Sequence, residues 1–124
     1  MSHNPHRIYQ IFRKLRILVQ LLLENTLFYQ NLCDPDGSQV YWHDYVHRIL
    51  SFQFDLETLF EEPNFPNLIH RMATLADGIR NLKNELKRIP VSLAGKVYLV
   101  RIDVSAQLRR REKAEREYFR ALGA

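Results

Sequence analysis

The chain has 124 residues, of which 46% are hydrophobic and 26% are charged, and its formal net charge is +4. This length is typical of one domain, and this composition excludes a disordered chain, which would carry fewer apolar residues and more one-sided charge. The single cysteine excludes an intramolecular disulfide and a cysteine-rich zinc site. We therefore expect one helical-bundle domain over residues 1–124, in a reducing cytoplasm.

A first helix is predicted over residues 5–32. Asn4 is a good N-cap, and Pro5 suits the first helical position because it has no N–H to leave unpaired. Apolar residues recur at helical spacing from Ile8 onward, and the middle of the helix is apolar almost all round. The most apolar run is residues 17–23, which is far too short for a membrane span, because a helix needs about 20 apolar residues to cross a bilayer. Such a helix is usually central in a bundle or covered by a second subunit, and we expect no membrane segment.

Two further helices are predicted between clear breaks, over residues 39–62 and 66–89. The first of these places Tyr45, Ile49 and Leu56 on one face of a helical wheel. In the second, two sets of apolar residues repeat every seven positions, which is an a/d heptad over nearly three repeats. This pattern suits the core of an antiparallel bundle, or alternatively a seam between subunits. The candidate seam residues are Met72, Leu75, Ile79, Leu82 and Leu86.

The segment from residue 92 to residue 122 is predicted as the fourth helix. Ser92 can cap it, and Leu93, Val97 and Val104 follow at helical steps. Residues 93–104 also contain many β-branched side chains, which favour a strand, but no convincing partner strand is evident. The predicted fold class is therefore all-α, an antiparallel four-helix bundle with helices at 5–32, 39–62, 66–89 and 92–122, which we expect to be oligomeric.

The charges are segregated along the chain. Residues 1–23 carry +4, residues 24–62 carry −7 and residues 63–124 carry +7, which together give the net +4. The first interpretation is that acidic and basic helices complement one another across the bundle surface and set their pairing. The alternative is that the basic elements form an external patch for nucleic acid or an acidic partner.

The candidate patch lies near the C-terminus, and its residues are Arg109, Arg110, Arg111, Lys113, Arg116 and Arg120. Four of them, at positions 109, 113, 116 and 120, are spaced so that they share one helix face, as contact with backbone phosphates requires. Glu112, Glu115 and Glu117 are interleaved with these bases and oppose this interpretation, because they can pair with them along the helix.

No catalytic residues and no cofactor site are predicted. His43 and His47 are one helical turn apart, which can place two imidazoles on one metal ion. The spacing identifies no third ligand, and His70 is the one further residue considered for that position. Surface histidines are the simpler interpretation. The serines lie in no nucleophile motif, and the glycines form no phosphate-binding loop.

The sequence thus predicts a non-enzymatic interaction, adaptor or assembly module that acts through an apolar helix face with segregated charge. Its partner would be a second copy of itself or another protein. The alternative function is a nucleic-acid-binding accessory protein that binds RNA or DNA through the basic C-terminal helix. A metal-dependent enzyme built on His43 and His47 is the third hypothesis.

Overall fold

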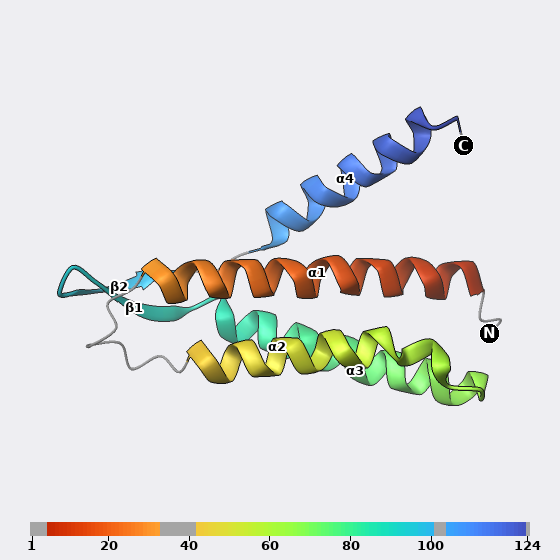
Figure 1. The fold of residues 1–124 in the computed structure, drawn as a ribbon, viewed down its shortest axis with the longest axis horizontal. Coiled ribbons are helices and arrows are strands. Elements are labelled where there is room, and N and C mark those ends of the chain that lie inside the picture. The colour runs from red at the N-terminus through yellow and green to blue at the C-terminus, as the bar shows by residue number, and fades with distance from the viewer. Residues whose placement is uncertain (1–4, 33–41, 101–103, 124) are drawn as a thin grey trace.

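The computed structural model describes residues 5–32, 42–100 and 104–123 (Figure 1). Along the chain the elements are α1 (Pro5–Leu32), α2 (Trp42–Glu57), a 3-10 turn η1 (Leu59–Glu61), α3 (Phe65–Leu86), β1 (Ile89–Leu93), β2 (Lys96–Val100) and α4 (Ser105–Ala121). Each of the four predicted helical regions therefore contains a helix, which covers most of the predicted range in the first three and residues 105–121 in the fourth. Asn4 and residues 39–41 lie outside the described residues.

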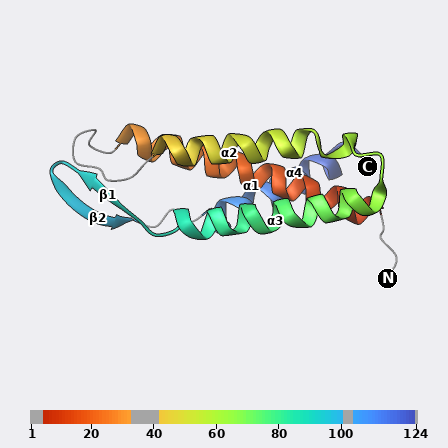
Figure 2. The same cartoon turned by 90° about the horizontal axis from the view of Figure 1, so that it is seen from below.

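Three helices, α1, α2 and α3, lie side by side in both ribbon views (Figures 1 and 2). Each runs antiparallel to the one before it, because only short connections separate them. Asn64 caps α3 as a good N-cap should, since its side chain accepts a hydrogen bond from the backbone N–H of Asn67 at 3.1 Å. At the contact between α2 and α3, a Cβ on Gly78 would lie 2.8 Å from the Phe52 ring, so glycine is what permits this close approach.

The core of the molecule is formed by the inward faces of these three helices. From α1 it contains Leu15, Val19 and Leu22, and from α2 it contains Ile49 and Leu56. The heptad residues of α3 complete it: Met72, Leu75, Ile79, Leu82 and Leu86 are all buried. The chain's own helices therefore cover the residues predicted as an oligomer seam.

The predicted helix over residues 92–122 is wrong in its first part. Residues 89–100 form an antiparallel hairpin instead, in which Ile89 pairs with Val100 and Leu93 pairs with Lys96. The connecting residues Ala94 and Gly95 both have positive φ, 53° and 78°, as a two-residue hairpin turn with matching twist requires. The missing partner strand is Ile89–Leu93, which the prediction had divided between the end of the third helix and the start of the fourth.

α4 departs from the predicted four-helix bundle. It begins at Ser105, contacts α1, and diverges from it along its length (Figure 1). The fully buried Val104 anchors its first turn to the core, whereas no described side chain of α4 itself is buried. The fourth helix is thus a projecting arm. Among the described residues, no helix is long and apolar enough to cross a membrane.

Candidate interaction surface

Polar contacts attach the first half of α4 to α1. The Asn25 side-chain amide donates to Gln107 Oε1 at 2.9 Å and to the Leu21 carbonyl at 2.8 Å. One turn further along α4, Arg111 Nη2 lies 3.3 Å from Glu24 Oε2. Hydrogen bonds and ion pairs of this kind orient a helix but bury little apolar surface, so α4 is positioned without being covered.

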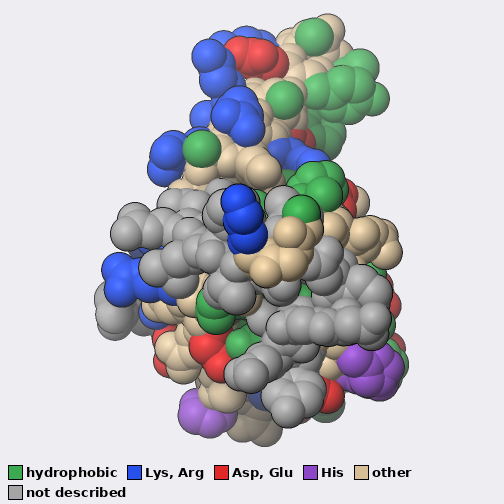
Figure 3. Space-filling view, turned by 90° about the vertical axis from the view of Figure 1, so that its left-hand side faces the viewer, with side chains coloured by type: hydrophobic (Ala, Val, Ile, Leu, Met, Phe, Trp, Pro, Cys, Tyr) green, Lys and Arg blue, Asp and Glu red, His purple; other side chains and the backbone are tan. Residues whose placement is uncertain are grey.

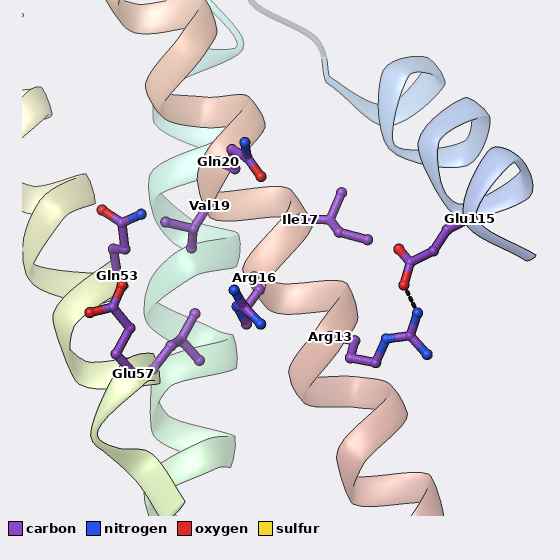
Figure 4. Close-up of a pocket in the computed structure, with 9 residues that line it drawn as sticks. Arg13, Arg16, Ile17, Val19, Gln20, Gln53, Glu57 and Glu115 are labelled. Carbon is purple, nitrogen blue, oxygen red and sulfur yellow. Dashed lines mark ion pairs between the residues drawn. The ribbon is translucent and has the colours of Figure 1, made fainter. Parts of the chain in front are cut away.

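Arg13 makes the contact nearest to the open end of α4. Its guanidinium forms an ion pair with Glu115 and lies 5.1 Å from the centre of the Phe119 ring (Figure 4). In the same view Arg16 points from α1 toward the side where α2 lies, beside a pocket of about 240 Å³ that Gln53 and Glu57 also line. Arg13 therefore adds a third contact between α1 and α4, beyond those of Asn25 and Glu24.

A groove opens between α1 and α4 because the two helices diverge. Its volume is about 570 Å³. The α1 wall consists of Gln10, Arg13, Lys14 and Ile17. The α4 wall consists of Glu112, Glu115, Arg116, Phe119 and Arg120. We call this the α1–α4 groove. Its lining combines the apolar side chains of Ile17 and Phe119 with four cations and two carboxylates, so the formal net charge of the lining is +2.

Large hydrophobic side chains remain exposed on α4 around this groove. The exposed fractions are 61% for Tyr118, 45% for Phe119 and 64% for Leu122. Seen from the end of the molecule, hydrophobic side chains gather on one side of the projecting arm, while Lys and Arg gather on the opposite side (Figure 3). A 17-residue helix that buries none of its described side chains gains little from packing, although packing usually supplies most of a helix's stability.

A second exposed face lies on α2. Leu50 and Phe54, one turn apart, are 43% and 63% exposed, and exposed Glu57 follows on the same side of the helix. We call Leu50, Phe54 and Glu57 the α2 outer face. Residues 42–62 contain five acids and one base, a net charge of −4. That base, Arg48, is held by Glu85 of α3 at 2.6 Å, and this hydrogen bond raises the pKa of Arg48 despite some desolvation.

The predicted basic residues divide between two sides of α4. Arg109, Arg110, Lys113, Arg116 and Arg120 are exposed, whereas Arg111 turns toward α1 and pairs with Glu24. The structure therefore brings together five of the six predicted bases and separates the sixth. The predicted seam residues, by contrast, lie in the core.

The two histidines of α2 lie next to each other at the surface. Their ring centres are 4.5 Å apart, and both side chains are exposed. His70 lies on α3 beside Asp55, near the end of α2 that is far from His43. Within the described ranges, no group of three or more His, Cys, Asp or Glu side chains is placed to hold a metal ion. Cys33 lies outside those ranges.

Sequence reasoning missed the groove. The signal for its α4 wall was present, since Leu108, Phe119 and Leu122 share a helix face at helical spacing. The α1 wall had no signal, because Gln10 and Lys14 are ordinary exposed residues whose importance depends on where α4 lies. Comparisons with protein-family models, curated proteins and solved structures gave no match.

Proposed function

We propose that the protein is a cytoplasmic, non-enzymatic assembly module that binds a second copy of itself. In this proposal the α1–α4 groove of one copy receives the α2 outer face of another. The observation that carries it is that α4 buries none of its described side chains and yet exposes Tyr118, Phe119 and Leu122 beside an open groove. Exposed apolar clusters rimmed by polar residues are typical of protein-binding sites.

Charge complementarity supports a second copy as the occupant. α4 carries six bases and three acids, a net charge of +3, while residues 42–62 carry −4. Both surfaces also present apolar side chains at their centres, with Phe119 in the groove and Phe54 on the α2 outer face. Opposite potentials around apolar centres favour association and fix its orientation.

The first experiment measures molecular mass by size-exclusion chromatography with light scattering over a range of protein concentrations. We expect the mass to rise above 14.8 kDa with concentration, and we expect Phe119→Ser combined with Leu122→Ser to return it to the monomer value. Leu27→Ser is the control, because Leu27 is an exposed leucine of α1 that does not line the groove. A monomeric wild-type protein at every concentration would overturn the proposal.

A charge exchange identifies the partner surface. Arg116→Glu with Arg120→Glu should weaken association. So should Glu57→Lys with Glu61→Lys, which also changes an exposed acid of η1, the turn that follows α2. Combining all four substitutions restores opposite charges across the proposed contact and should recover association, because each repulsive pair becomes attractive again. If the combined variant associates no better than the two parents, the α2 outer face is not the occupant of the groove.

A further inference from the structure

α4 carries a row of cations, of which Arg116 and Arg120 also line the α1–α4 groove whereas Arg109 and Lys113 lie outside it. Arg109, Lys113, Arg116 and Arg120 fall within about 60° of one another on a helical wheel. All four are exposed, and none forms an ion pair with another described residue. At 1.5 Å per residue the row is about 16 Å long. We call these four residues the outer basic stripe.

The position of the interleaved glutamates decides what this stripe can do. On sequence grounds they were expected to pair with the bases along the helix. In the structure Glu115 pairs instead with Arg13 of α1, and one carboxylate oxygen of Glu112 is buried on the groove side. Glu117 is the exposed carboxylate that remains on the outer side. Outside the groove lining, the exposed Arg109, Arg110 and Lys113 with Glu117 carry a net charge of +2, and the exposed Arg116 and Arg120 extend this row along the groove.

We propose that the outer basic stripe binds the phosphodiester backbone of nucleic acid. A straight row of cations about 16 Å long matches a polyanion with regularly spaced charges, because several phosphates of one strand lie within that length. In this proposal the four cations contact backbone phosphates, which are the same at every base. Binding is therefore independent of sequence and comes from the release of counterions.

The placement of the apolar side chains favours nucleic acid over an anionic lipid surface. An interfacial helix buries its whole apolar face in the bilayer and keeps its cations at the rim. In α4 the side opposite the stripe is attached to α1 through Gln107, Arg111 and Glu115, so that face cannot lie flat on a membrane. Figure 3 shows Lys and Arg side chains gathered on the side of the arm opposite its hydrophobic side chains.

Fluorescence anisotropy of the full chain with a labelled DNA duplex, and separately with a single-stranded RNA of the same length, tests the proposal. With four phosphate contacts, the slope of log K against log salt is about −3.6 for duplex DNA, so affinity falls roughly 150-fold between 50 and 200 mM salt. Arg109→Gln with Lys113→Gln removes two of these contacts. The slope should then be about −1.8 and the salt effect roughly 12-fold.

The matched control is Arg88→Gln with Lys96→Gln, which removes one arginine and one lysine elsewhere on the described surface and should leave affinity almost unchanged. Arg109 and Lys113 do not line the α1–α4 groove, so their loss should not affect self-association. Conversely, Phe119→Ser with Leu122→Ser should abolish self-association and retain nucleic-acid binding, which separates the failure of one proposal from the failure of the other.

Three results would overturn the proposed stripe. The first is the absence of binding to both nucleic acids at low salt. The second is an equal loss of affinity in the stripe variant and the matched control, because that would indicate an effect of net charge alone. The third is binding to vesicles of anionic phospholipid with no binding to either nucleic acid, which would assign the stripe to a membrane surface instead.

Discussion

Leu82→Ala tests whether the heptad face of α3 belongs to the core of a single chain. Leu82 is completely buried among residues of the same chain. The substitution removes three carbon groups, and at about 0.8 kcal/mol each the lost transfer free energy is about 2.4 kcal/mol. The cavity left behind adds to this, and buried leucines replaced by alanine cost about 3 to 5 kcal/mol altogether. We therefore expect the free energy of unfolding to fall by about 3 to 5 kcal/mol.

Urea denaturation followed by circular dichroism provides the measurement, at low and at high protein concentration. The Phe119→Ser and Leu122→Ser background is used so that association through the groove does not contribute. Leu50→Ala is the control, since Leu50 undergoes the same chemical change on α2 but is 43% exposed and should lose far less stability. An intramolecular core gives a loss that is independent of concentration, whereas an interface depends on it by mass action. A loss as small as that of Leu50→Ala, or one that changes with concentration, would refute the assignment.

Two further predictions concern the hairpin and the surface of the helices. Ala94→Asn should raise the free energy of unfolding by about 0.5 to 1 kcal/mol, because residue 94 has a φ of 53° that asparagine adopts more readily than alanine; an unchanged or lowered melting temperature would contradict this. A double-mutant cycle with Arg48→Gln and Glu85→Gln should give a coupling free energy of about 0.2 to 1 kcal/mol, since both side chains are nearly half exposed, and 1 M salt should reduce it. Because Glu85 raises the pKa of Arg48, the contribution of Arg48 is complete below its unfolded-state pKa and is lost only as pH rises through the folded-state value. Arg48 should therefore stay charged across the neutral pH range, and the coupling free energy between Arg48 and Glu85 should not change through it. A loss of coupling near neutral pH that is traced to Arg48 would contradict the structure.

Local signals in the sequence were enough to locate three of the helices. Pro5 at the start of α1 and the seven-residue spacing in α3 each depend on neighbours within a few positions, so they are readable without tertiary structure. The four stripe residues on α4 were predicted as one helix face for the same reason, since helical spacing alone places them together.

What the sequence could not decide depended on contacts between distant segments. Residues 93–104 have mixed preferences, and the strand over residues 96–100 is stabilised by pairing with residues 89–93, which the prediction had divided between the ends of two helices. Likewise, the heptad face can serve a core or a subunit seam, and only the packing of α1 and α2 against α3 assigns it to the core.

The arm formed by α4 is the clearest case of a feature that only tertiary structure decided. Its sequence predicted a basic helix face, with interleaved glutamates that could pair with the bases along the helix. Arg13 and Glu24 of α1 draw Glu115 and Arg111 to the inner side. Those two contacts join α4 to α1, whereas the outer basic stripe forms no ion pair among the described residues, because a charged side chain pairs with whichever partner the fold brings nearest.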